Sequence, residues 1–360
     1  MANTKITNPE LFNLGDSTSA TQLPVMTTTQ RIAMTGLSVG EMIFNSTTDK
    51  VEYFDGTKWY GITYEELGIP IDYLVVAGGG GGGGFGGGGG AGGLLTTTAF
   101  GGTQTKILQL TTTQYTVIIG GGGAPPTQSS YDYGVNGGDS EFNSIISTGG
   151  GGGGYYNAIA GLTGGSGGGG GGSSGGVSPG GTASALTQGN NGGPGGGNST
   201  TGSYSGGGGG GGAGTAGSLP SMPSNKGGAG GAGLEVNIIG GSGNYYAGGA
   251  GGFSGDNQTG PALGGIGGGG NGGGYSPSYA ATQGTDGLGG GGGGAYNYTG
   301  AWAARGGSGV VIVRYPAAYN VIISSGAQPS AGNFNALVSG STTEKFTKFT
   351  TVGSLFFTIS

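Results

Sequence analysis

The side chains that could support acid–base or metal chemistry are scarce in this chain, and they are carboxylates. The sequence has no histidine and no cysteine, which excludes disulfides, Cys/His zinc sites and histidine-dependent catalysis. A glycoside hydrolase needs two placed carboxylates, and the acidic residues of the long glycine-rich segment give that activity poor support. They are Asp132, Asp139, Glu141, Glu235, Asp256 and Asp286. We therefore expect no enzymatic activity.

Three of these acids lie close together in the sequence. Asp132, Asp139 and Glu141, with Asn136 between them, carry the oxygen ligands that Ca²⁺ prefers. Their spacing matches no EF-hand loop, and the nonapeptide repeat of calcium β-rolls is absent. Charges on solvated loops explain these residues better than a metal site does. We expect neither a bound metal nor a cofactor.

Tyrosine is the residue type best suited to bind a partner in this sequence. Segments rich in Tyr, Ser, Thr, Asn and Pro interrupt the glycine runs, and a tyrosine ring can bind sugars or protein surfaces with little side-chain entropy to lose. The same rings could instead cover the ends of a glycine lattice and shield it from water. The binding candidates are Tyr131, Tyr133, Tyr155, Tyr156, Tyr204, Tyr245, Tyr246, Tyr275, Tyr279, Tyr296, Tyr298 and Trp302.

Glycine must supply the scaffold that positions these rings. Of the 103 glycines, 93 lie between Gly78 and Gly309, which is about 40% of that segment and far above the content of a domain with an ordinary hydrophobic core. Apolar runs bracket the segment, at 74–77 and at 310–313, and predict two buried strands that bring its ends together. Shorter β-like runs inside it are KILQL (106–110), YTVII (115–119), FNSII (142–146) and LEVNII (234–239).

Side chains recur every third residue within the glycine-rich segment. The series are Phe85, Ala91 and Leu94; Ala229, Ala232 and Glu235; Ala247, Ala250, Phe253 and Asp256; Leu263 and Ile266; and Ala213 and Ala216. An extended helix of the polyproline II type has three residues per turn, so each series predicts one edge with side chains and two bare edges. Collagen does not fit, because glycine runs such as 206–212 break the G-X-Y repeat.

A single glycine helix of this kind cannot be stable. Ordering one residue costs roughly 1–2 kcal/mol, and glycine is the worst case, whereas a net hydrogen bond returns about 0.5–1.5 kcal/mol. In a lattice, inner glycines can exchange N–H and C=O groups with neighbours and add weak Cα–H···O contacts. Strands, aromatic rings or a partner subunit must then supply the remaining stability.

The two ends of the chain differ from its middle. Residues 1–70 are rich in charge and predict a short helix at 27–35 and an antiparallel meander of strands at 41–45, 51–54 and 58–62, too small to hold a good core without copies of itself. Residues 317–360 predict a small β unit, with strands at 320–324, 334–338, 345–352 and 354–360. We therefore divide the chain into an attachment or oligomerisation module (1–70), a glycine-rich domain (71–316) and a C-terminal β unit (317–360).

Two stretches carry a resemblance to known proteins. The run TTTQRIAMTGLSVGEMIFNSTTDKVEYFDGTKWYGI resembles a short module of bacteriophage tail-fibre and other virion-fibre proteins. The segment from IDYLVVAGGGGGG to GGSGVVIVRY resembles the glycine-rich domain of phage receptor-binding adhesins. The resemblance implies a mostly irregular and β fold, namely a layered bundle of polyglycine II helices closed by short β-strands, with small β units at both termini.

The resemblance also implies a function. It is that of a fibre adhesin subunit, forming homotrimers, that binds a polysaccharide or outer-membrane protein on the bacterial surface and contacts other virion proteins. The resemblance further implies a location in the virion, in a tail or fibre, and the lack of an apolar leader in the sequence fits assembly in the host cytoplasm. Net charge of −6 and the lack of long apolar stretches argue against nucleic acid and membrane insertion. Two alternatives stay open: a purely structural virion appendage, and an ice-binding protein, which would need a flat Ala/Thr face.

Overall fold

The chain folds into two compact units, Met1–Leu67 and Gly68–Ser360. A computed structural model describes residues 23–62, 69–98, 101–102, 106–108, 114–127, 132–173, 175–196, 206–221, 224–255, 260–275, 279–296, 302–325 and 333–359. Each unit has its own sheets and is described by itself below.

The first unit is a four-stranded sheet with one short helix. The elements are β1 (Val25–Met26), α1 (Thr28–Ile32), β2 (Met42–Asn45), β3 (Lys50–Phe54) and β4 (Trp59–Ile62), and the strand order is β1-β2-β3-β4. The predicted helix and meander are confirmed, although the helix is shorter than expected. Thr27 caps it in a capping box with Gln30, which satisfies amides that the first turn leaves without intrahelical partners.

A buried ion pair joins the helix to the sheet. The Arg31 guanidinium donates to Glu52 Oε2 at 2.6 Å, and Asn45 Nδ2 donates to both oxygens of the same carboxylate. Burial alone would raise the pKa of Glu52, but the hydrogen bonds from Arg31, Asn45 and Thr48 outweigh it and hold the pKa below its ordinary value. This face of the sheet is therefore occupied by the helix and by the polar network around Glu52.

Two sheets form the base of the second unit. The six-stranded sheet has the order β17-β18-β15-β5-β6, with β7 also paired to β5, and the five-stranded sheet has the order β10-β9-β8-β19-β16. Their strands are β5 (Ile69–Val76), β6 (Leu94–Thr96), β7 (Lys106–Leu108), β8 (Tyr115–Ile119), β9 (Ser140–Phe142), β10 (Ile145–Ser147), β15 (Val310–Pro316), β16 (Val321–Ser325), β17 (Ala336–Leu337), β18 (Glu344–Phe349) and β19 (Gly353–Ile359).

The predicted meeting of the two bracketing strands is confirmed. Strand β5 pairs antiparallel with β15, with Val76 opposite Val310 and Leu74 opposite Ile312. The C-terminal strands predicted from the sequence are also present, but they extend both base sheets, since β18 pairs with β15 and β19 pairs with β8. The run 142–146 is not one strand: it is the turn of a hairpin between β9 and β10, with Asn143 and Ser144 at positive φ.

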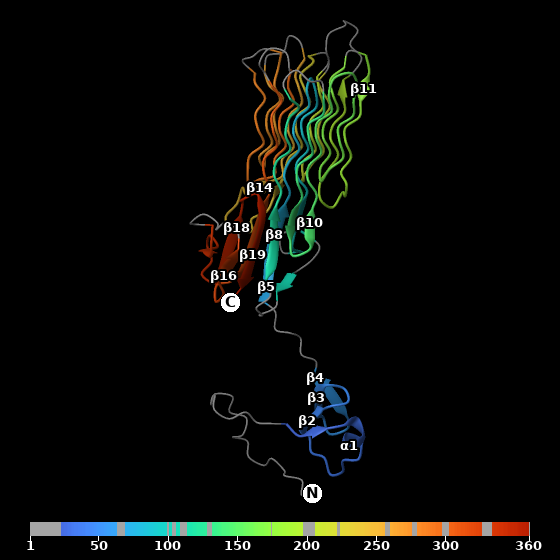
Figure 1. The fold of residues 1–360 in the computed structure, drawn as a ribbon, viewed down its shortest axis with the longest axis vertical. Helices are drawn as coiled ribbons and strands as arrows, with labels where there is room; N and C mark the ends of the chain where they lie inside the picture. Colours follow the sequence, from blue (N-terminus) through green and yellow to red (C-terminus); the bar gives the residue numbers. More distant parts are fainter. Residues whose placement is uncertain are drawn as a thin grey trace. The chain divides into compact units, whose positions relative to one another are not determined.

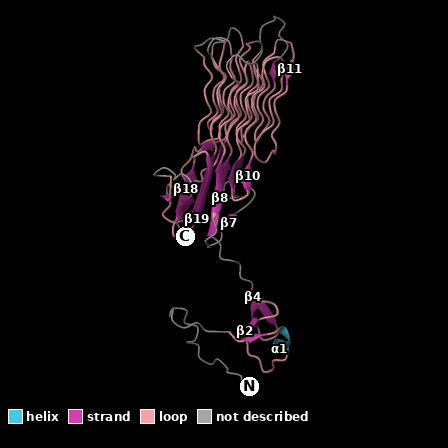
Figure 2. Ribbon diagram, in the orientation of Figure 1, coloured by secondary structure: helices cyan, strands magenta, loops and turns pink. Residues whose placement is uncertain are grey.

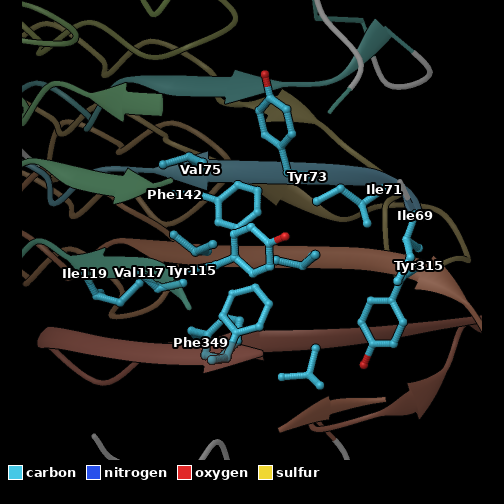
Figure 3. Close-up of a cluster of buried hydrophobic side chains, with 14 residues drawn as sticks. Ile69, Ile71, Tyr73, Val75, Tyr115, Val117, Ile119, Phe142, Tyr315 and Phe349 are labelled. Carbon is cyan, nitrogen blue, oxygen red and sulfur yellow. The ribbon is translucent and has the colours of Figure 1, made fainter. Parts of the chain in front are cut away.

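The two sheets pack face to face. Their shared core, seen in Figure 3, contains side chains from both, among them Tyr73 and Val311 on one side and Tyr115 and Phe142 on the other. The opposite face of the six-stranded sheet is covered by a second cluster that includes Val236, Ile238 and Tyr246. From Tyr73 to Val76, strand β5 is therefore buried on both faces, which explains the continuous apolar sequence of this part of the strand. Of the run 234–239, only β13 (Leu234–Glu235) is a strand.

Beyond the sheets, the glycine-rich segment forms extended rods that run side by side (Figures 1 and 2). The rod of residues 78–84 shows their bonding. Its consecutive amides donate in three directions: Gly78 to Gly138, Gly79 to Gly307 and Gly80 to Gly90, at 2.9–3.0 Å. The next three repeat the pattern, with Gly81 donating to Val135, Gly82 to Ala304 and Gly83 to Gly87. A repeat of three with no hydrogen bond inside the rod is the geometry of a polyglycine II helix.

Contacts around this rod show why it consists of glycine. A Cβ on Gly78 would lie 2.1 Å from the carbonyl oxygen of Gly121, and a Cβ on Gly81 would lie 2.2 Å from that of Ala124. The other glycines of the rod would meet two further neighbours at similar distances, at Gly290 and Gly293 and at Gly151 and Gly154. All three edges of the rod are therefore filled by backbone, and none has room for a side chain.

Rods at the perimeter carry the predicted edges of side chains. Ala229 and Glu235 are exposed and Ala232 is half-buried, so this series faces solvent. Ala250 and Phe253 of the next series are buried and face inward. Ala247 is buried too, but its φ of 58° is not that of an extended rod, and Asp256 lies outside the described residues. The series beginning at Phe85 was predicted wrongly: Phe85 has a φ of 50° and forms the turn between two rods, so it does not share a rod edge with Ala91.

Polar side chains replace missing neighbours at the perimeter. Asn136 accepts from the amide of Gly152 at 2.9 Å and donates to the carbonyl of Thr163 at 3.0 Å. Asn190 donates to the carbonyls of Gly212 and Ala213. Because an unpaired buried peptide group costs about 1–3 kcal/mol, such side chains let the lattice end without a penalty.

Two adjacent glycines test the packing. In Gly122→Ala the new Cβ would lie 1.9 Å from the carbonyl oxygen of Gly306, whereas in Gly121→Ala it would lie 3.6 Å from a methyl group of Val352. We expect Gly122→Ala to lower the free energy of unfolding by about 1–3 kcal/mol or more. Gly121→Ala should leave it unchanged or raise it by about 0.4–1 kcal/mol, because alanine restricts the unfolded chain. Denaturant unfolding of both variants measures this, and equal effects would contradict the lattice.

An ion pair at the sheet end of the rods should make stability depend on pH. Asp286 accepts from both terminal nitrogens of Arg305, at 2.8 and 2.6 Å, and from the Ser308 amide at 2.9 Å. Chiefly through the Arg305 hydrogen bonds, the pKa of Asp286 falls from 3.8 to about 2. A depressed folded-state pKa gives stability that is present above the unfolded pKa and is lost as the pH falls toward 2. The difference in melting temperature between the natural chain and Asp286→Asn should therefore shrink between about pH 4 and pH 2; a constant difference would refute this.

Candidate binding site at the tip of the glycine-rich unit

The rods belong to the second unit, Gly68–Ser360, which we call the glycine-rich unit. They reverse direction at its end away from the sheets, which we call the tip (Figure 1). Backbone hydrogen bonds place several reversals at one level. The amide of Phe85 donates to Ala295, that of Tyr156 to Gly84, and that of Phe253 to Gly86. Positive φ angles at Asn157 and Ala158 belong to the same set of turns. Aromatic residues far apart in the sequence are thereby brought together on a lattice that fixes their backbones.

A buried aromatic cluster closes the lattice at this end. Phe85, Phe253 and Tyr296 are 5%, 1% and 7% exposed, and Tyr156 packs against them half-buried. Ring centroids lie 4.1 Å apart for Phe85 and Tyr296, 5.6 Å for Phe253 and Tyr296, and 5.9 Å for Phe85 and Tyr156. Tyr296 therefore acts as a lid over the glycines. The sequence interpretation named Tyr296 and Tyr156 but missed the central role of Phe85 and Phe253, whose signal is a lone aromatic residue inside a glycine run.

Other tyrosines surround this cluster and remain accessible. Tyr275 packs on Tyr296 at 4.7 Å between centroids while staying 48% exposed. Tyr133 meets Tyr155 edge to face at 5.0 Å, and both are half-buried. Each of these rings packs against a neighbouring ring and keeps part of its surface accessible.

The remaining candidates are divided between the two ends of the unit. Tyr279 lies opposite Gly274 in the reversal after Tyr275, and its carbonyl accepts from the Gly274 amide at 2.8 Å. Trp302 is half-buried and begins the rod that leads to β15. Tyr131, Tyr204 and Tyr298 lie outside the described residues.

Tyr245 and Tyr246 are not at the tip. They form strand β14 (Tyr245–Tyr246), which pairs with β13 at the sheet end of the rods. Tyr246 is 2% exposed and packs with Leu74 and Val76, and burial raises its pKa to about 12. The structure therefore separates this pair from the tip tyrosines, and Tyr246 is covered by the core.

The acidic residues stay apart. Asp139 accepts from the amide of Gly149 at 2.7 Å, Glu141 from that of Ser144 at 3.0 Å, and Glu235 from that of Gly243 at 2.7 Å. Asp132 is exposed near the tip, and Asp256 lies outside the described residues. Among the residues that the structure describes, no three acidic side chains gather in a way that could hold a metal ion. Asp139, Glu141 and Glu235 thus bind backbone amides.

In the part of the chain that the structure describes, no helix has the length and apolar character needed to cross a bilayer.

Comparison with known families identifies the class of protein. A family model described as a glycine-rich domain matches residues 57–316, more than half of the chain, so the chain belongs to that family. A second model, described as a phage tail like trimerisation region, matches residues 3–72. Searches of curated proteins and of solved structures gave no match.

The two matches together define a phage tail-fibre-like protein with a glycine-rich domain. They indicate a virion component that assembles as a homo-oligomer. The expected relation to phage fibre proteins is thereby confirmed.

Replacing single aromatic residues of the tip by alanine should distinguish rings that stabilise the lattice from rings that are merely accessible. Phe253→Ala removes a fully buried ring from the tip cluster and should lower the free energy of unfolding by about 3–5 kcal/mol. Tyr275→Ala removes a half-exposed ring and should cost about 1 kcal/mol or less. Denaturant unfolding of the two variants provides the comparison. A larger loss for Tyr275→Ala would show that the cluster is not what closes the lattice.

Proposed function

We propose that the chain is a non-enzymatic fibre adhesin subunit, which binds the surface of the bacterial host through the tip of its glycine-rich unit. The observation that carries this proposal is the placement of half-exposed Tyr133, Tyr155 and Tyr275 around a buried aromatic cluster at one end of a rigid lattice. The ligand is a surface polysaccharide or an outer-membrane protein, because accessible tyrosine rings can bind sugars as well as protein surfaces.

The lattice favours binding because it reduces the entropy that binding must overcome. The backbone next to each tip ring is held by hydrogen bonds to neighbouring rods, such as that from Tyr156 to Gly84. Rings that are fixed before contact lose little freedom on association. In a homotrimer, three tips present the same surface, and simultaneous engagement raises the apparent affinity without new contacts.

A competition experiment tests the adhesin function. Purified full-length protein should reduce adsorption of the phage to its host in a concentration-dependent way. No competition at saturating protein, with normal oligomer formation, would favour a structural appendage that contacts other virion proteins. A thermal hysteresis assay on the same sample covers the ice-binding alternative, for which we expect no activity.

Two tyrosine variants locate the binding surface. Tyr275→Ala should weaken competition by about tenfold or more, because a well-placed aromatic contact contributes more than about 1 kcal/mol to binding. The control is Tyr245→Ala, a half-buried tyrosine at the sheet end of the rods. It should compete like the natural protein, with melting temperatures measured for both. Equal loss in the two variants would argue against the tip.

A further inference from the structure

The four-stranded sheet of the first unit has two unlike faces. Residues directly opposite each other on paired strands lie on the same face of a sheet. Met42 pairs with Tyr53 and Tyr53 with Tyr60. In the other row Val25 pairs with Phe44, Phe44 with Val51, and Val51 with Ile62. These two rows form one face made of Val25, Met42, Phe44, Val51, Tyr53, Tyr60 and Ile62, which we call the tyrosine face.

The tyrosine face is apolar, ordered and accessible. Tyr53 is 38% exposed, Tyr60 39% and Val25 57%. The two tyrosine rings stack with centroids 5.5 Å apart and planes 18° apart, and the Lys58 ammonium lies 4.7 Å from the centre of the Tyr60 ring. Side chains already held in place by each other form a surface that a partner can cover with little loss of side-chain entropy.

The opposite face of the described sheet is largely covered by helix α1. Helix α1 packs there through Arg31, which binds Glu52, and through Thr28, whose hydroxyl pairs with the Asn45 amide. Glu52 and Asn45 are 4% and 0% exposed. Phe54 and Trp59, also on this face, pack on each other with ring centroids 5.4 Å apart and are half-buried. The exposed large apolar side chains of the described sheet, Val25, Tyr53 and Tyr60, all lie on the tyrosine face.

The small core of the first unit indicates that this face is covered. Among the described residues of the unit, the buried apolar side chains are Ile43 and Val51, and a single small sheet with so little core usually needs disulfides, metals or oligomerisation to be stable. The chain has no cysteine, and among the described residues no cluster of metal-binding side chains is found. Oligomerisation is the remaining source of stability. Residues 3–72 match a trimerisation region, which indicates that the partners are further copies of this chain.

We propose that the tyrosine face is the surface through which copies of this chain pack against one another in the homo-oligomer. Tyr53 and Tyr60 supply the central contacts, in keeping with the preference for aromatic residues in interface cores. This assignment does not depend on receptor binding by the tip. The chain could form an oligomer through the tyrosine face and still not compete for adsorption to the host. Conversely, it could bind the host through the tip while its copies assemble through a different surface.

Charged substitutions on the two faces test the proposal in the full chain. In solution, the natural protein should have three times the mass of one chain by light scattering. The double variant Tyr53→Asp/Tyr60→Asp should require at least about tenfold higher concentration to assemble, because it places unpaired charge in the interface. Ile32→Asp is the matched control: Ile32 is 72% exposed on α1 and should tolerate the charge without loss of assembly. A natural protein of single-chain mass, or equal effects of the two changes, would overturn the proposal.

Cross-linking provides a readout that does not require a destabilised variant. Because the chain lacks cysteine, Val25→Cys, Tyr53→Cys and Tyr60→Cys each introduce the only thiol. With a short bismaleimide, at least one of them should give a covalent dimer of chains. Lys50→Cys, exposed on the opposite face beside Asn45, should not. Cross-linking through Lys50→Cys alone, or through none of the four, would show that copies do not meet at the tyrosine face.

Discussion

Lateral hydrogen bonding between side-chain-free backbones is the interaction on which the glycine-rich unit depends. Because the rods repeat every three residues, the amides of rod 78–84 point in turn at three neighbouring segments, and a Cβ on its glycines would meet three others, so every edge is occupied by another backbone. Glycine is then a requirement of packing, although it is the residue with the highest entropy cost of ordering. The interior of the rod lattice consists of hydrogen-bonded backbone, whereas most proteins bury apolar side chains there.

Such a lattice needs side chains at its boundaries. At one end, β5 continues into one rod and another rod continues into β15. These two strands anchor the rods in a sandwich of two sheets with an apolar core. At the other end, Phe85, Phe253 and Tyr296 cover the last turn of glycines. Along the sides, side-chain amides such as those of Asn136 and Asn190 pair with peptide groups that have no neighbouring rod. The stability of the middle is thus completed by the residues around it.

This arrangement separates the parts of the chain that hold the structure from the parts that can meet a partner. A substitution in a central rod collides with backbone, whereas a residue at a reversal of the tip, such as Tyr275, contacts one ring and solvent. Accessible tip residues such as Tyr275 can therefore change with little effect on the lattice. In the first unit a similar division holds within one sheet, where Glu52 and Arg31 complete one face and Tyr53 and Tyr60 leave the other available.

The sequence by itself determined the kind of packing: its glycine content, the spacing of three and the two bracketing strands specified rods closed by a sheet, and the strand-like runs at the C-terminus gave real strands. Only the tertiary structure decided which loops share the tip. Tyr245 and Tyr246 look like tip residues in the sequence but belong to β14 at the sheet end, and Phe85 is a turn although its spacing suggested a rod edge. The reason is physical: a run of glycines looks the same after a shift of three residues, so it carries no information on register, rod length or the end at which the chain reverses. That information lies in contacts between side chains distant in sequence, such as Phe85 with Tyr296 and Tyr246 with Leu74.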